Sequence, residues 1–326
     1  MIISKAPLRI SFVGGGSDLP AYFQKDVGSV VSVTIDKYVY VCVNKKFDGG
    51  IRVSYSKTEN VSTVEQIEHP IVRESLRHFN INNGIEIVTV ADIPGTGTGL
   101  GSSSSFTVAL CRALADYTGC SLGAQELAEL AFYIEMDRCG APVGKQDQYA
   151  AAFGGLNFIQ FFSNGDVKVE RLKVSDGYLE RLKKSAALIY TGRARSASAI
   201  LKVQQHEIAN DDQKWGLTRK IVETSQRFLG LLQQEAPVSK LAELLDISWR
   251  LKRAQSAGIS DSELDTLYEK YIQAGLWGGK LLGAGGGGFF LLLGSEQSVR
   301  QLSEASNKNN FVKFNFCSVG VTSRRF

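Results

Sequence analysis

The first third of the chain carries β-branched and aromatic residues that partly alternate with polar ones. Residues 8–13, 29–43 and 85–90 follow this pattern, which is typical of strands. The third segment stops at Asp92-Ile93-Pro94, because proline has no N–H to donate to a sheet. The pattern therefore predicts strands that lead into a glycine-rich turn.

Helical spacing begins after that turn. Apolar side chains recur at intervals of three and four positions, at Phe106, Leu110, Ala113, Leu114 and Tyr117. Gly119 stands where a glycine commonly ends a helix. Residues 102–105 are thus expected in the first turn of this helix. A second helix is expected over residues 124–137, with Glu135 at its C-terminal end.

The second half mixes strand-like and helical segments without strict alternation. Strands are expected at residues 156–162, 188–191, 289–293 and 311–321, and helices at residues 197–208, 217–234 and 241–257. This mixture predicts an α+β fold more than a doubly wound sheet. We place the boundary between two lobes near residue 175, giving domains 1–175 and 176–326.

Composition narrows the classes of partner. A chain of 326 residues favours two domains. Its net charge of +4 comes from scattered basic residues, which argues against nucleic acid and suits phosphorylated ligands. Five cysteines, none in a C-x-x-C pair, favour reduced thiols. Without a signal-like N-terminus or an apolar run of about 20 residues, a cytoplasmic protein without membrane contact is expected.

The glycine- and serine-rich turn is the strongest candidate for binding a nucleotide's phosphates. The candidate residues are Pro94, Gly95, Gly97, Gly99, Leu100, Gly101, Ser102, Ser103, Ser104 and Ser105. Glycines let backbone N–H groups approach a polyanion, and the start of a helix adds its own N–H groups and dipole. The alternative is a flexible serine-rich surface loop.

Two common nucleotide motifs do not fit this turn. A Walker loop needs a lysine after its last glycine, and none follows Gly101. Residues 283–288 satisfy the dinucleotide pattern G-x-G-x-x-G, but they precede a strand-like segment where that fingerprint needs a helix. A Rossmann interpretation is therefore rejected.

Two further segments could carry chemistry. Residues 7–18 place Arg9 on a strand that runs into three glycines and Asp18, although Asp18 could simply close a turn. Glu135 and Asp147 flank a loop that Pro142 and Gly144 keep out of a helix. One carboxylate could hold Mg²⁺ and the other accept a proton; the alternative is a pair of solvated acids.

The three segments 7–18, 94–105 and 283–288 resemble the three motifs of the GHMP superfamily of galactokinases, homoserine kinases, mevalonate kinases and phosphomevalonate kinases. Within it, the chain is similar to the bacterial D-glycero-D-manno-heptose 7-phosphate kinases through residues 7–12, 34–40, 144–151 and 190–198. The resemblance implies a two-lobed fold, with an N-terminal nucleotide-binding α/β lobe and a C-terminal ferredoxin-like α+β lobe.

The resemblance also implies roles for single residues. Asp147 would take the proton of the attacking hydroxyl, and Arg9 would stabilise the transferring phosphoryl. Ser103 and Glu135 would hold Mg²⁺, although the nearby Asp137 leaves the choice of carboxylate open. Sugar contacts are expected from Gly15, Gly16, Ser17, Asp18, Gly285 and Gly286.

The implied reaction is ATP- and Mg²⁺-dependent phosphorylation of the anomeric hydroxyl of D-glycero-D-manno-heptose 7-phosphate, giving the 1,7-bisphosphate. A fucokinase-like or galactokinase-like enzyme, and a non-catalytic sugar-sensing regulator on the same fold, are the alternatives. The sugar's phosphate would need cations, for which Arg193 and Arg195 are candidates unless they are ordinary surface charges. A homodimer is possible.

Overall fold

The computed structural model describes residues 1–93, 97–306 and 310–326, and two long strands form the centre of its first sheet. β1 (Ile2–Val13) pairs antiparallel with β2 (Gly28–Lys45), which pairs antiparallel with β5 (Ile85–Ala91). The strands predicted in the first third are confirmed. The remaining strands of this sheet are β3 (Ile51–Ser54), β4 (Thr58–Val61), β6 (Leu156–Phe161), β7 (Val167–Arg171), β11 (Phe316–Cys317) and β12 (Thr322–Arg325).

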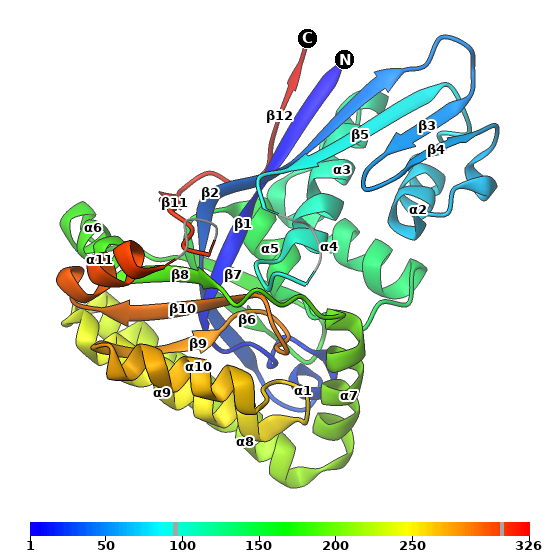
Figure 1. Ribbon diagram of the computed structural model, residues 1–326. Helices are drawn as coiled ribbons and strands as arrows, with labels where there is room; N and C mark the ends of the chain where they lie inside the picture. The colour runs from blue at the N-terminus through cyan, green and yellow to red at the C-terminus, as the bar shows by residue number, and fades with distance from the viewer. Residues whose placement is uncertain (94–96, 307–309) are drawn as a thin grey trace.

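Helices cover one face of this sheet (Figure 1). Residues of β2 and β5 share a core with α3 (Ser102–Thr118) and α5 (Gln146–Phe153). α4 (Ala124–Tyr133) packs beside them, and the chain continues into a π-helical turn, Ile134–Arg138. The helix expected over residues 124–137 is thus regular only to Tyr133, and Glu135 lies in the π-helical turn. The short α1 (Pro20–Phe23) and α2 (Pro70–His78) complete the helices of this half.

A second, antiparallel sheet has the order β8-β10-β9. Its strands are β8 (Ala186–Tyr190), β9 (Leu276–Leu281) and β10 (Phe289–Gly294). The helices of this half are α6 (Asp176–Lys184), α7 (Ala197–Asn210), α8 (Asp212–Gln233), α9 (Val238–Gln255), α10 (Ser262–Gln273) and α11 (Glu296–Ala305). Trp249 of α9 packs edge-on against Phe290 of β10, with ring centroids 6.1 Å apart.

The two halves share a hydrophobic core. One cluster of buried residues combines Leu8 and Ile10 of β1 with Leu188 of β8, Leu241 of α9 and Leu291 of β10. Burial of such side chains stabilises the contact by roughly 1.5–3 kcal/mol each. The two halves are therefore packed directly on one another.

The end of the chain differs from the expected division at residue 175. β12 pairs antiparallel with β1, and β11 pairs with β2, so both strands belong to the first sheet. Residues of β11 and β12 therefore belong with the N-terminal lobe, although the expected C-terminal domain 176–326 includes them. The strand expected over residues 311–321 is also wrong in extent, because only Phe316–Cys317 pair with β2 and Phe311 makes an isolated bridge to Ile189.

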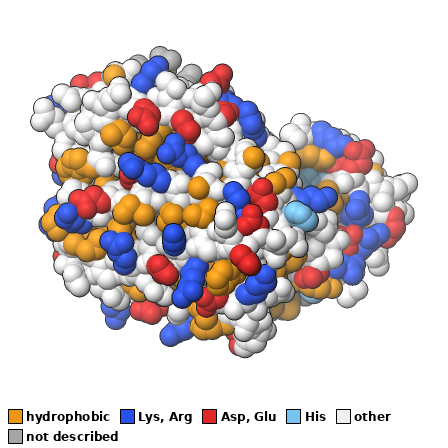
Figure 2. Space-filling model, turned by 90° about the horizontal axis from the view of Figure 1, so that it is seen from below, with side chains coloured by type: hydrophobic (Ala, Val, Ile, Leu, Met, Phe, Trp, Pro, Cys, Tyr) orange, Lys and Arg blue, Asp and Glu red, His pale blue; other side chains and the backbone are white. Residues whose placement is uncertain are grey.

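The α+β fold class is confirmed by these mixed layers of helices and sheets. Within the described residues, no helix combines the length and the apolar character that a membrane span requires. On the face seen in Figure 2, basic and acidic side chains are interspersed with small hydrophobic areas.

Candidate active site

The phosphate loop, residues 97–105, runs directly into a helix. α3 begins at Ser102, so Ser102–Ser105 lie in its first turn as predicted. Gly99 and Gly101 both have a φ of +78°, which glycine adopts without strain. A Cβ on Gly99 would lie 2.4 Å from the carbonyl oxygen of Leu282, so only glycine fits there. The candidates Pro94 and Gly95 lie outside the described residues.

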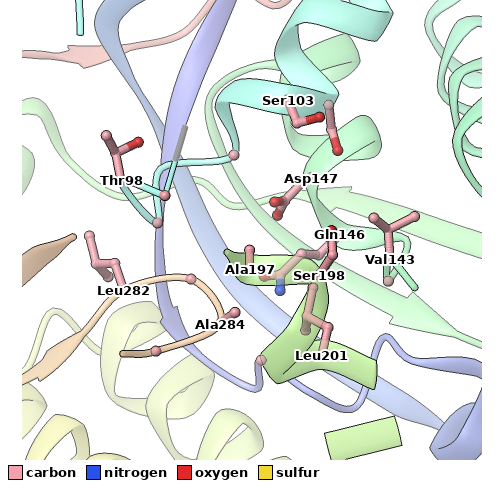
Figure 3. Close-up of a pocket in the computed structure, with 18 of the residues that line it drawn as sticks. Thr98, Ser103, Val143, Gln146, Asp147, Ala197, Ser198, Leu201, Leu282 and Ala284 are labelled. Atoms are coloured by element: carbon pink, nitrogen blue, oxygen red, sulfur yellow. The ribbon is translucent and has the colours of Figure 1, made fainter. Parts of the chain in front are cut away.

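The phosphate loop forms one wall of a cavity of about 590 Å³, a volume typical of small-molecule sites. The cavity is lined by Arg9, Gly15, Gly16, Asp18, Leu19, Gly97, Thr98, Gly99, Gly101, Ser102, Ser103, Ser104, Val143, Gly144, Gln146, Asp147, Ala194, Arg195, Ser196, Ala197, Ser198, Leu201, Gln204, Lys252, Leu282, Gly283, Ala284, Gly285 and Gly287. In Figure 3, Ser103 and Asp147 lie on one side and Leu282 and Ala284 on the other.

Arg9 and Asp147 form a two-pronged ion pair in this cavity, with Arg9 buried and Asp147 partly exposed. Nε of Arg9 donates to Oδ1 of Asp147 and Nη2 donates to Oδ2, both at 2.8 Å. Nη1 donates to the carbonyl oxygen of Gly99 at 2.6 Å, which ties the pair to the phosphate loop. The two residues singled out for catalysis are therefore brought together, 138 positions apart in sequence.

Asp147 lies in the first turn of α5, directly after the loop that it was expected to flank. Pro142 and Gly144 keep only the preceding residues out of the helix, which begins at Gln146. A carboxylate in the first turn of a helix is stabilised by the helix dipole. This position holds the Asp147 side chain at the cavity wall on a rigid element.

Asp18 lies close to this pair and is also buried. Its oxygens accept hydrogen bonds from the backbone N–H groups of Gly16, at 2.9 Å, and Gln146, at 3.3 Å. Burial, and then the negative charge of Asp147, raise the pKa of the Asp18 carboxyl, while these two N–H groups oppose the rise. Asp18 thus does more than close a turn, because it connects the loop after β1 with the start of α5.

Glu135 is buried behind the phosphate loop. Its carboxylate accepts hydrogen bonds from Ser104 Oγ, at 2.9 Å, from Gln148 Nε2, at 2.6 Å, and from Thr107 Oγ1. Burial raises the pKa of Glu135 to about 7, against the effect of these three donors. Ser103 lines the cavity, but the serine that contacts Glu135 is Ser104.

The two arginines considered for a sugar phosphate differ in position. Arg193 is committed to Asp261, with contacts of 2.6 and 3.1 Å, and to Glu263, at 3.0 Å. This pairing lowers the pKa of Asp261 to about 2. Arg195 lines the cavity and reaches Asp261 only at 3.3 Å. Arg193 does not line the cavity, so Arg195 is the better placed of the two.

Other candidate residues support the loops that form the cavity walls. Ser17 donates to the carbonyl oxygens of Gly14 and Ser29, and Ser105 donates to that of Pro7. Leu100 is fully buried. Gly286 packs against Ile200 and Arg195, whereas Gly285 lines the cavity. Apart from Gly285, these residues shape the loops without lining the cavity.

Sequence reasoning missed Lys252 and Gln204, which are both buried and line the cavity. Lys252 stands on the apolar stripe of α9 with Leu241, Leu245 and Ser248. A lysine on a stripe that otherwise faces the core is costly unless it has a partner or a role. That misplaced charge was the signal that could have revealed it.

Comparisons with known proteins agree with this geometry. A family model described as the GHMP kinases N terminal domain matches residues 65–155, and the model of the GHMP kinases C terminal matches residues 233–312. The D-glycero-alpha-D-manno-heptose 7-phosphate kinase of Campylobacter jejuni is 30% identical over 338 residues, covering 99% of both chains. The bifunctional fucokinase/GDP-fucose pyrophosphorylase of Arabidopsis thaliana is 24% identical, over 89% of this chain and 29% of its own length.

A crystal structure of a D-glycero-D-manno-heptose 1-phosphate kinase from Bacteroides thetaiotaomicron has the same architecture. It superposes with a TM-score of 0.80 at 26% identity, over 100% of this chain and 99% of its own. The two matched regions include residues 97–105 and 282–288, two of the segments that line the cavity. The chain belongs to the GHMP kinase family and is a sugar kinase of that family.

Proposed function

We propose that the enzyme transfers the γ-phosphoryl of ATP to the anomeric hydroxyl of D-glycero-D-manno-heptose 7-phosphate, giving the 1,7-bisphosphate. The observation that carries the proposal is the Arg9–Asp147 pair, which lies between the phosphate loop and Asp18. A hydroxyl bound at Asp18 would face the carboxylate of Asp147 on one side and the end of the nucleotide on the other.

In this mechanism the acceptor oxygen attacks the γ-phosphorus, and the bond to the β-phosphate oxygen breaks with its electron pair leaving on ADP. Asp147 takes the hydroxyl proton, and its contacts with Arg9 keep the carboxylate oriented. N–H groups of the phosphate loop and of the start of α3 would bind the nucleotide's phosphates. Asp18, with Gly15 and Gly16, would bind sugar hydroxyls.

Mg²⁺ fits the residues beside the phosphate loop. Within residues 1–93, 97–306 and 310–326, the desolvated carboxylate of Glu135 accepts hydrogen bonds from neutral groups only. The hydroxyl groups of Ser103 and Ser104 lie together on the first turn of α3. Mg²⁺ commonly takes one or two protein oxygens together with nucleotide phosphates. When bound, the ion would neutralise phosphate charge during transfer.

The names of the relatives differ on the acceptor, since one is a heptose 7-phosphate kinase and another a heptose 1-phosphate kinase. A panel of heptose 7-phosphate, heptose 1-phosphate, unphosphorylated heptose, fucose and galactose, with ATP and Mg²⁺, would separate these acceptors and the fucokinase- and galactokinase-like alternatives. We expect the highest kcat/KM with the 7-phosphate. A preference for any other acceptor would contradict the proposal.

The role of Asp147 is tested by Asp147→Asn. The substitution keeps the size of the side chain but removes the proton acceptor, so kcat should fall by about 100-fold or more. Affinity for a non-hydrolysable ATP analogue should stay within about threefold by calorimetry. Asp176→Asn is the matched control, since Asp176 is an exposed acid in the first turn of α6. Near wild-type turnover of Asp147→Asn would remove this residue from the mechanism.

A further inference from the structure

Two buried lysines of the C-terminal half lie beside the catalytic pair. Lys252, on α9, is 4% exposed, and Lys280, on β9, is 2% exposed. Lys252 lines the cavity and donates a hydrogen bond to the carbonyl oxygen of Gly283. Nothing in the proposed mechanism uses either residue, although buried lysines are rare and costly.

The contact with Gly283 places Lys252 at the junction of two loops. The hairpin loop between β9 and β10, residues 282–288, touches the phosphate loop at Gly99, and a Cβ on Gly283 would lie 2.4 Å from Gly99 Cα. Arg9 donates to the carbonyl oxygen of Gly99 on the other side of this junction. One cation from each half of the molecule therefore reaches the place where the two glycine loops meet.

The two cations differ in how they are held. Arg9 has already committed donors on three of its nitrogens to Asp147 and Gly99. Lys252 has one contact, with Gly283, and an ammonium group carries three donors. Among the contacts of the described residues, Arg9 is held in an ion pair with Asp147, whereas Lys252 has no carboxylate partner and keeps two donors for a ligand in the cavity.

The charges around Lys252 are nearly balanced. Arg9 and Lys280 are basic neighbours, and Asp18 and Asp147 are acidic ones. Burial, and then the charge of Arg9, lower the pKa of Lys252 to about 8, while Asp18 and Asp147 oppose the shift. The pKa of Lys280, which does not line the cavity, lies well below the usual value of lysine because of burial and its cationic neighbours. Lys252 is therefore the lysine that can carry a desolvated charge at neutral pH.

We infer that Lys252 is a further catalytic residue, whose ammonium group contacts the γ-phosphoryl during its transfer while Arg9 stays with Asp147. The inference rests on the proposed function and extends it. Lys252 forms no covalent bond and keeps its protons. The new bond joins the acceptor oxygen to phosphorus, and the electron pair of the broken bond leaves on ADP. Asp147 receives the hydroxyl proton. A cation already desolvated stabilises the charge of the transition state without reorganising water.

Lys252→Met tests this role, because methionine keeps much of the side-chain length without the charge. We expect kcat to fall about 100-fold, the size of effect seen when a single charge-stabilising donor is removed. The KM for the sugar, the affinity for a non-hydrolysable ATP analogue and the Tm should change little. Lys240→Met is the control, since Lys240 lies on the same helix with an exposed side chain.

Lys252→Arg distinguishes charge from packing. Arginine is larger than methionine but stays charged, so a catalytic role predicts at least tenfold more activity for Lys252→Arg than for Lys252→Met. The wild-type kcat should decline as pH rises above about 8, because the ammonium group loses its proton, and Lys252→Arg should lack this decline. If Lys252→Met were as active as Lys252→Arg, or more active, the inference would be overturned. It would also be overturned if Tm and nucleotide affinity fell in parallel with kcat.

A measurement of ATP hydrolysis in the absence of sugar separates this inference from the choice of acceptor. If wild-type protein phosphorylated no sugar in the panel, the proposed function would fail. The effect of Lys252→Met on ATP hydrolysis would still be measurable, and an unchanged hydrolysis rate would count against Lys252 itself.

Discussion

Glu135 is a buried carboxyl whose protonation affects the stability of the fold. Its carboxyl is 1% exposed and accepts three hydrogen bonds from neutral groups. The raised pKa of about 7 means that the folded protein holds a proton between about pH 4.5 and 7, whereas the unfolded chain releases it. Stability that this proton provides is present below pH 4.5 and is lost as pH rises through 7.

Glu135→Gln should remove this dependence. Without divalent cations, we expect the variant to exceed the wild type in free energy of unfolding at pH 8 by an amount on the order of 3 kcal/mol, and to lose that advantage near pH 5. Urea unfolding at the two pH values, with EDTA, measures the difference. Glu223→Gln, an exposed acid on α8, is the control. Parallel pH dependence in the wild type and Glu135→Gln would show that Glu135 is ionised throughout.

Single residues could be assigned from the sequence where a motif sets their surroundings locally. Arg9 and Asp18 were singled out because they flank a glycine-rich segment, and Asp147 because it flanks the loop that contains Pro142 and Gly144; all three line the cavity. The hydrogen bond of Glu135 with Ser104 was not foreseen, since it depends on how the π-helical turn packs against α3. Lys252 was missed because its partner lies in a loop 31 positions away.

At the scale of elements, the segment between β8 and α7 connects the cavity with the acidic start of α10. Arg193 is held by Asp261 and Glu263, which leaves Arg195 at the cavity wall. The Arg195 side chain also lies near Gly286 of the hairpin loop, and its backbone lies near Gly97 of the phosphate loop. Arg195 could thus serve the sugar's phosphate or those of the nucleotide.

Arg195→Ala distinguishes these roles. If Arg195 binds the phosphate of the sugar, the KM for the phosphorylated heptose should rise roughly tenfold or more, as expected for one charge-assisted hydrogen bond. The KM for an unphosphorylated heptose should hardly change. Arg219→Ala, an exposed arginine of α8, controls for loss of surface charge. A rise in the KM for ATP alone would assign Arg195 to the nucleotide.

Most elements that carry the site were predictable from their periodicity. α3, α7, α8 and α9 follow helical spacing, and β1, β2, β5 and β10 are continuous strand-like runs. α5 was not among the expected helices, although Pro142 and Gly144 keep only the residues before Gln146 out of a helix. The pairing of β11 and β12 with the first sheet was not predictable, since short segments carry no sign of a partner so far away in sequence.

At the scale of the whole molecule, the cavity takes its walls from both halves. Arg9, Asp18 and Asp147 come from the first half, and Arg195, Lys252 and Gly285 come from the second. The shared core that includes Leu8 and Leu291 fixes these walls against each other. The distribution explains why no single segment of the sequence contains the complete site.

The pairing of β12 with β1 has a consequence for the order in which the protein can be made. Lys5 pairs with Thr322, so one edge of the first sheet waits for a strand that the ribosome adds more than 300 positions later. At typical rates of translation this delay is about 15 seconds to a minute. During that time an unpaired strand edge is open to wrong partners, including neighbouring nascent chains. We expect ribosome-bound chains that stop before Phe316 to be cleaved by protease in the first sheet faster than the released protein, whereas equal protection would mean that the sheet is stable before its last strand arrives.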